Sequence, residues 1–173
     1  MSRLQQIEPA ILFADSDMSY KGRKTPLDQK IASVVDKLPK ATRVFIIPIT
    51  TQRTSSQFPT VDKFLGRARD TDALRYNRVS FSHPVYILYS SGTTGPPKCL
   101  VHHHGVILQL KKVALLHNSL GPHDMVFQYS STSWVLFNIL NGHLSTGATN
   151  ILYDGSPLWP DATSMLKILD KFR

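Results

Sequence analysis

The sequence has little cysteine and no long apolar run. Cys99 is its only cysteine, so no disulfide can form within the chain, and such a chain is typical of a reducing compartment. The apolar runs are short, whereas a membrane-spanning helix needs about 20 consecutive apolar residues. The first residues also lack the apolar core of a signal peptide. We therefore expect a cytoplasmic protein that has no membrane partner.

The sequence also lacks long blocks of like charge, although its formal net charge is +8. The positive charge is spread along the first half of the chain, without the interleaved aromatic residues that would stack on bases. A hydrophobic content of 42% and a charged content of 18% are typical of a globular protein. Dispersed charge leaves electrostatic attraction to nucleic acid open as an alternative, but we predict no nucleic-acid partner.

Short apolar runs alternate with amphipathic stretches along the chain. Residues 11–13 and 44–47 predict buried strands, and apolar residues at helical spacing over residues 27–38 lie between them. This order is typical of a parallel sheet flanked by helices, so we predict the α/β class. Residues 50–78 are expected to form surface loop with one helical turn. Further strands are expected at residues 84–89, 99–102, 125–129 and 148–153.

Amphipathic stretches in the second half of the chain predict three helices. The first covers residues 106–116, and a second is expected over residues 134–144. The apolar face of the first is expected to contain Val106, Ile107, Leu110, Val113 and Leu116. The third covers residues 162–172, with Asp161 as its N-cap. Because the chain stops at Arg173 within this alternation, we expect an incomplete domain.

A loop rich in glycine and hydroxyl groups follows the strand expected at residues 84–89. Backbone N–H groups converge on a phosphate when glycines let the chain bend and approach closely. Hydroxyls add donors, and a lysine adds positive charge for the outer phosphates. The residues that supply these groups are Ser90, Ser91, Gly92, Thr93, Thr94, Gly95 and Lys98. The loop therefore predicts a phosphate-binding site.

The spacing within this loop excludes the Walker type of phosphate loop. That pattern needs four residues between its glycines, followed at once by Lys and Ser or Thr. Here two residues separate Gly92 from Gly95, and Lys98 follows two prolines. Pro96 and Pro97 lack N–H donors and stiffen the chain, which disfavours a helix that starts at the second glycine. We expect a strand–loop–strand phosphate-binding hairpin instead.

The loop resembles the signature of a known superfamily. Residues 89–98 are similar to the signature loop of the acyl-adenylate-forming enzymes, the AMP-dependent synthetases and ligases. The flanking residues 99–112 and 147–157 resemble the acetoacetyl-CoA synthetases, and the triple histidine at 102–104 separates them from the acetyl-CoA synthetases. By this resemblance, residues 1–173 are an incomplete segment of the large N-terminal AMP-binding (adenylation) domain, and the C-terminal domain is absent.

The resemblance implies an acid–thiol ligase that uses ATP, Mg²⁺ and coenzyme A. A carboxylate, acetoacetate or a similar short acid, attacks the α-phosphate of ATP and releases pyrophosphate. The thiol of coenzyme A then displaces AMP from the acyl-adenylate. The loop would grip the β- and γ-phosphates, with Lys98 and Mg²⁺ stabilising the charge on the leaving pyrophosphate. The resemblance also implies that Trp134 forms a wall of the acyl pocket; the alternative is a tryptophan packed in the core at a helix start.

Two residues depart from the pattern of the relatives. Ser133 stands where they usually carry glycine before the aromatic residue, and its side chain would narrow the pocket or shift the turn. Asn150 is polar at a position where the strand is expected to be apolar.

Three consecutive histidines raise the question of metal binding. In a strand, only His102 and His104 would share a side, and no Cys or acidic residue lies at zinc-like spacing. We predict that the histidines support the strand, and we assign no metal ligand.

The motifs that contact adenine and ribose in the relatives, and their catalytic lysine, are missing from this sequence. We therefore assign no catalytic residue and expect the chain by itself to be inactive, since its parallel sheet would lack the covering that such sheets require. The alternatives left open are a non-catalytic remnant or weak nucleotide-binding fragment, and an enzyme similar to the acetyl- or propionyl-CoA synthetases.

Overall fold

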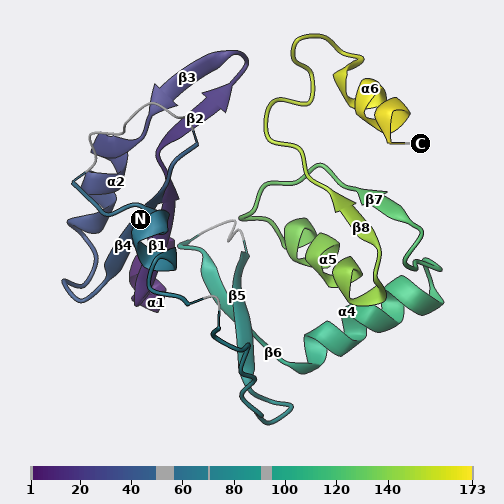
Figure 1. Cartoon of the computed structure of the whole chain (residues 1–173), viewed down its shortest axis with the longest axis horizontal. Coiled ribbons are helices and arrows are strands. Elements are labelled where there is room, and N and C mark those ends of the chain that lie inside the picture. Colours follow the sequence, from purple (N-terminus) through teal and green to yellow (C-terminus); the bar gives the residue numbers. More distant parts are fainter. Residues whose placement is uncertain (1, 50–56, 70, 91–94, 173) are drawn as a thin grey trace. The chain divides into compact units, whose positions relative to one another are not determined.

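The computed structural model describes residues 2–49, 57–69, 71–90 and 95–172, and the chain divides into two compact units (Figure 1). Residues 1–77 and 94–97 form the first unit, and residues 78–93 and 98–173 form the second. Helices alternate with short strands in both units, so the predicted α/β class is confirmed. None of the described helices has the length and apolar character needed to cross a membrane.

The first unit is built on a two-stranded parallel sheet. Strand β1 (Ile11–Asp15) pairs with β4 (Arg43–Ile47), and helix α2 (Asp28–Val35) lies between them in the chain. The strand–helix–strand unit predicted from the apolar pattern is therefore confirmed. The short helices α1 (Ser2–Ile7) and α3 (Val61–Leu65) complete the unit, and α3 is the helical turn expected within residues 50–78.

The two faces of β4 carry different parts of the core. Val44 and Ile46 pack with Ile31 of α2 on one face. Phe45 points to the other face, because neighbouring side chains alternate across a strand. There its ring lies 5.8 Å from that of Phe13 and 5.0 Å from that of Phe64 in α3, measured between centroids. Phe13 nevertheless stays exposed, so the expectation of a buried strand at residues 11–13 is correct for the strand and wrong for its full burial.

A β-hairpin that the sequence did not reveal lies between β1 and α2. It joins β2 (Asp17–Tyr20) to β3 (Arg23–Pro26). Lys21 and Gly22 both have positive φ, 49° and 75°, which is the backbone of a tight two-residue hairpin turn. Both strands are short and largely exposed, and Met18 and Tyr20 are too few to mark a strand by alternation.

The second unit begins with an antiparallel hairpin of β5 (Pro84–Ser90) and β6 (Lys98–His103). This confirms the strand–loop–strand arrangement expected from the loop prolines. The strand expected at residues 99–102 is present, but it is not buried: Cys99 is half-buried, and the side chains of Leu100 and Val101 are exposed. Successive side chains point to opposite faces, and within the described residues neither face of the hairpin is fully covered.

The rest of the second unit packs two helices with a second parallel sheet. Strands β7 (Met125–Phe127) and β8 (Thr149–Ile151) pair in parallel, and α5 (Val135–His143) and the 3₁₀ turn η1 (Leu144–Thr146) lie between them in the chain. Helix α4 (Gly105–Leu116) packs on α5, with Ala114 and Leu140 fully buried. These elements confirm the helices and strands predicted over residues 106–153. Leu116 is a correction, because it is 73% exposed rather than on the buried face.

The last helix, α6 (Ser164–Lys171), begins later than predicted. Thr163 is its N-cap residue, so the assignment of Asp161 as the N-cap is wrong. A carboxylate oxygen of Asp161 accepts hydrogen bonds from the backbone N–H and the hydroxyl of Thr163, at 2.8 and 2.6 Å. The aspartate thus closes the turn that precedes the helix, because its short side chain reaches the backbone two residues further on.

Candidate functional site

The β5–β6 hairpin sets the two ends of the predicted phosphate loop opposite each other. Ser90 and Lys98 are paired in the register, and they are the last paired residues at this end of the hairpin. Ser90 is half-buried, whereas Lys98 is exposed. The loop between them therefore starts and ends at one place, with a hydroxyl on one strand and an ammonium group on the other. Ser91, Gly92, Thr93 and Thr94 lie outside the described residues.

The described part of the loop, residues 95–97, offers open space and one tether. A Cβ added to Gly95 would meet no atom within 4 Å. The carbonyl oxygen of Pro97 accepts a hydrogen bond from Nε2 of Gln6 in α1, at 3.0 Å. Gln6 lies 91 residues away along the chain, and no local pattern marks a glutamine for such a contact, so sequence reasoning missed it. The tether holds the carbonyl group next to Lys98, while the surface beside Gly95 stays free.

Trp134 comes from a different element of the second unit. It is the N-cap residue of α5, with an extended backbone, and its side chain is 51% exposed. The alternative of a tryptophan packed in the core is therefore wrong. Its backbone N–H donates to the carbonyl oxygen of Ser131 at 3.1 Å, and the hydroxyl oxygens of Ser131 and Ser133 lie 3.2 Å apart. Trp134 thus follows a polar turn and presents much of its indole ring at the surface.

The histidines after the loop brace the hairpin. The His102 ring packs on Tyr86 of the paired strand, with centroids 5.1 Å apart. The His103 ring lies 5.3 Å from that of Phe81, and its Nδ1 accepts a hydrogen bond from the N–H of Gly105. This agrees with the prediction that they support the strand. Within the ranges that the structure describes, no group of three His, Cys, Asp or Glu residues could hold a metal ion.

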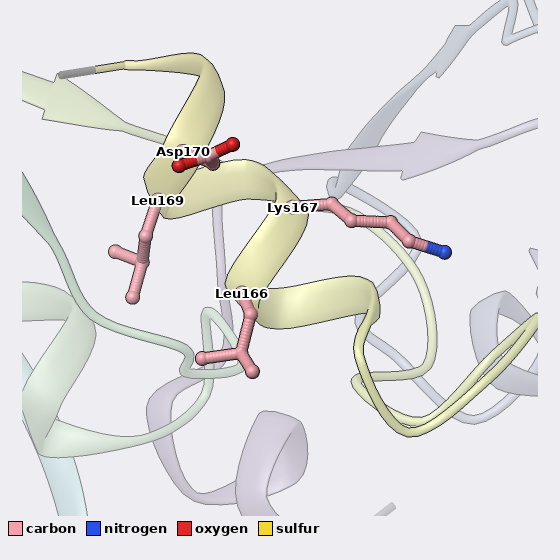
Figure 2. A pocket seen from close by; sticks show the side chains of 4 residues that line it. All are labelled: Leu166, Lys167, Leu169 and Asp170. Atoms are coloured by element: carbon pink, nitrogen blue, oxygen red, sulfur yellow. The ribbon is translucent and has the colours of Figure 1, made fainter.

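Neither of two surface hollows is lined by a predicted site residue. One, of about 390 Å³, runs along α6 and is lined by Leu166, Lys167, Leu169 and Asp170 (Figure 2). All four belong to one helix, so no polar groups converge there from separate elements. The other, of about 180 Å³, lies in the first unit and is almost wholly apolar. Its lining residues are Leu4, Leu12, Ala14, Leu27, Lys30, Ile31 and Val34. Neither hollow has the chemistry of a nucleotide site.

The fold and the hairpin together define a class of α/β proteins in which a glycine- and hydroxyl-rich loop joins two antiparallel strands and ends in a lysine. The family model described as AMP-binding enzyme matches residues 2–173, and the chain belongs to this family.

Among individual proteins, the chain is similar to acyl-CoA synthetases of short acids. The chain is 36% identical to an acetoacetyl-CoA synthetase of Gallus gallus over 99% of its own length and 27% of that protein. It is 35% identical to a malonamoyl-CoA synthetase of Penicillium aethiopicum over 92% of its length and 23% of that protein. The solved structure of acetoacetyl-CoA synthetase from Streptomyces lividans superposes with a TM-score of 0.89 at 35% identity, over 99% of this chain and 26% of that one. The chain thus spans about a quarter of the length of these relatives.

Proposed function

We propose that this chain is a segment of an acyl-CoA synthetase, in which it holds ATP and part of the acyl pocket while a short carboxylate is activated. The acetoacetyl-CoA synthetases among its relatives favour acetoacetate as that acid. The observation that carries the proposal is the hairpin register, which sets Ser90 opposite Lys98 at the mouth of the glycine-rich loop.

The chemistry of the first step assigns a role to each group at the loop. Attack of the carboxylate on the α-phosphate of ATP builds negative charge on the leaving pyrophosphate. The exposed ammonium group of Lys98 and the hydroxyl of Ser90 stabilise this charge from the two ends of the loop. The intervening Ser91, Gly92, Thr93, Thr94 and Gly95 add backbone N–H groups and hydroxyls to the β- and γ-phosphates.

Mg²⁺ reaches this site with the nucleotide. The ion keeps several waters and often binds through substrate phosphates, with few protein ligands. Since no cluster of ligating side chains occurs in the described ranges, the phosphates of ATP supply its main oxygen ligands. When bound, the ion neutralises phosphate charge. Lys98 adds a second positive charge that is fixed by the strand.

Trp134 contributes to the acyl pocket. Its exposed ring forms one wall for the acyl group, and Ser133 beside it adds a side chain that narrows the space. Coenzyme A then takes the acyl group from the adenylate. The chain acts in the cytoplasm, without a membrane or nucleic-acid partner, as part of a longer polypeptide that supplies the C-terminal domain.

A chimera tests the proposal. Residues 2–173 replace the matching segment of the Streptomyces lividans enzyme, and acetoacetate-dependent ATP–pyrophosphate exchange is measured. We expect exchange, and we expect Lys98→Ala to lower its rate by about a hundredfold or more, as loss of a charge-stabilising donor does elsewhere. Lys111→Ala, at an exposed position of α4, is the matched control and should leave the rate unchanged. A folded chimera that shows no exchange, or one indifferent to Lys98→Ala, contradicts the proposal.

A second candidate is a nucleotide-binding fragment without catalysis. It is favoured by the exposed apolar side chains on β6 and α4, such as Val101 and Leu108, and by the quarter of the relatives' length that the chain spans. Calorimetry of the 173-residue chain with Mg-ATP, taken together with the chimera, distinguishes the two: binding by the chain with no exchange by a folded chimera supports the fragment. Exchange by the chimera with acetate or propionate, but not with acetoacetate, would instead place the enzyme with the acetyl- and propionyl-CoA synthetases.

A further inference from the structure

Two loops leave the second parallel sheet at the same edge. Strands β7 and β8 run in parallel, with Phe127 opposite Ile151, so the chain leaves both strands at their carboxyl ends (Figure 1). The loop after β7 leads through Ser130–Ser133 to Trp134, and the loop after β8 contains residues 152–157. In open α/β sheets the carboxyl edge is where ligands bind.

Two tyrosine hydroxyls hold the loop after β8 from two sides. The hydroxyl of Tyr129, from the loop after β7, donates to the carbonyl oxygen of Gly155 at 3.0 Å. The hydroxyl of Tyr153 donates to the carbonyl oxygen of Ser156, also at 3.0 Å. The two rings lie 6.3 Å apart with an interplanar angle of 56°. Two consecutive carbonyl groups of one loop are thus bonded to two aromatic side chains.

The held loop has a backbone that few sequences adopt. Gly155 has φ +142°, a conformation that side-chain-bearing residues rarely take, and a Cβ there would lie 3.4 Å from the hydroxyl oxygen of Tyr153. Ser156 is only 4% exposed. Gly155 therefore lies close against the ring of Tyr153. The hydrogen bond from the hydroxyl of Tyr129 to Gly155 joins this loop to the loop after β7.

We propose that Tyr129 and Tyr153 are positioning residues, an arrangement we call the tyrosine latch. Tyr129 fastens the loop after β8 to the loop after β7, and Tyr153 holds the loop after β8 in its conformation. The latch thereby fixes the position of Trp134. Only four residues lie between Tyr129 and Trp134 along the chain, and the hydrogen bond from the backbone N–H of Trp134 to the carbonyl oxygen of Ser131 shortens the link between them. Movement of Tyr129 away from Gly155 therefore displaces the turn that carries the indole. The role assigned to Trp134 rests on the proposed function; the latch itself does not.

The latch is tested first in the 173-residue chain, without any substrate. Trp159→Phe leaves Trp134 as the only tryptophan, so fluorescence quenching by acrylamide reports on that ring alone. In this background the double change Tyr129→Phe and Tyr153→Phe should raise the quenching constant. It should also speed exchange of the backbone N–H groups within residues 153–157, which are those of Tyr153, Asp154, Gly155 and Ser156, by about fivefold for each hydrogen bond removed. Tyr76→Phe, at an exposed tyrosine, is the matched control and should change neither quantity.

The chimera described above provides the functional readout. The double change should raise KM for acetoacetate about tenfold, the loss expected for about 1.4 kcal/mol of binding, while KM for Mg-ATP stays within about twofold. A merely structural defect would raise both values together. Tyr129→Phe alone changes an exposed ring and removes only the bond to Gly155, so it is the variant least expected to unfold the chain. It should give part of the rise in KM for acetoacetate.

The outcomes separate the latch from the proposed function. If quenching of Trp134 and exchange of residues 153–157 do not respond to the double change, the latch is wrong. An equal rise of both KM values also overturns it. If these two signals respond as expected but the chimera is inactive with every acid, the latch stands and the proposed function fails.

Discussion

Gly142 of α5 lies directly against Leu110 of α4. A Cβ built on Gly142 would fall 2.9 Å from the Cβ of Leu110 and 3.0 Å from its Cδ1, closer than real Cβ contacts come. The absence of a side chain is therefore what lets the two helices approach at this point. The same contact area holds the buried Ala114 of α4 and Leu140 of α5, the best-buried residues of the second unit's core.

Gly142→Ala should destabilise the chain. The added methyl group must push Leu110 aside, and overpacking of this kind typically costs about 1–3 kcal/mol. Alanine is the better helix former by about 1 kcal/mol, which offsets part of the loss. We expect a net decrease of about 1 kcal/mol in the free energy of unfolding, measured by urea denaturation. Gly121→Ala, where the nearest atom is 3.9 Å from the added Cβ, is the control, and an equal loss there would contradict this account.

His143 should make stability fall in mild acid. The residue is 7% exposed, and its Nδ1 has no hydrogen-bond partner among the described residues. Burial lowers its pKa below the usual 6.5, because the charged ring loses hydration. The neighbouring elements add little charge: α5 carries no other titratable group, η1, β7 and β8 carry none, and those of α4, Lys111 and Lys112, are exposed.

The sign of this pH dependence follows from proton binding. Above pH 6.5 His143 is neutral in both the folded and the unfolded chain, so its contribution to stability is fully present. As the pH falls below 6.5 the unfolded chain takes up the proton first, and the free energy of unfolding decreases until the folded-state pKa is passed. The difference in the free energy of unfolding between the wild type and His143→Leu should therefore vary with pH in this window. Urea denaturation of both proteins across this window measures the effect, and a difference that stays constant with pH would contradict it.

Asp161 should titrate far below an ordinary aspartate. The hydrogen bond from Lys167, at 2.7 Å, and those from the hydroxyl and N–H of Thr163 stabilise the carboxylate and lower its pKa from 3.8 to about 2. Any stability that this provides is present above pH 3.8 and is lost as the pH falls towards 2. Lys167→Met should raise the pKa of Asp161 towards 3.8, as followed by NMR of the side-chain carboxyl. Lys171→Met is the control, and a pKa unchanged in both variants would show that Lys167 plays no part.

Asn150 joins strand β8 to helix α5. Its Nδ2 donates to the carbonyl oxygen of Leu140 at 2.8 Å, and its Oδ1 is buried without a partner in the described part of the chain. Asn150→Asp removes the donor and places a carboxylate against that carbonyl, so it should lower the free energy of unfolding by about 2 kcal/mol or more at pH 7. The loss should shrink in acid, where the protonated form donates again.

Asn150→Leu is the matched comparison. It takes the donor away from the Leu140 carbonyl but also removes the unpaired buried oxygen, and it adds no charge, so the loss should be smaller than for aspartate, about 1 kcal/mol. Denaturation of both variants at pH 4 and pH 7 checks the pair of expectations. A larger loss for leucine than for aspartate at pH 7 would contradict them.

Much of the fold was predictable because its signals are local. The apolar runs of β1, β4 and β5, and the helical spacing in α2 and α4, appear in the sequence because each element buries part of its surface. The prolines after Gly95 likewise predicted a hairpin rather than a helix. In contrast, the hairpin of β2 and β3 has strands of four largely exposed residues, so its sequence contains too short a pattern to detect.

The errors occur where burial depends on distant partners. Leu116 continues the apolar pattern of α4 but lies beyond the contact with α5, so it stays exposed. Asp161 has the right residue type for an N-cap, but its carboxylate bonds to Thr163 before the helix starts. Trp134 fits a core position by hydrophobicity, yet its side chain is half exposed.

The sequence by itself determined the family, most of the order of helices and strands, and the set of residues that we predict to hold phosphate. It does so because backbone preference, hydrophobic period and loop chemistry are properties of neighbouring residues. Only the tertiary structure decided that Ser90 lies opposite Lys98, that Gln6 holds Pro97 and that Tyr129 is bonded to Gly155. Those relationships join residues separated by many positions, and they exist only once the strands have paired and the loops have been brought together.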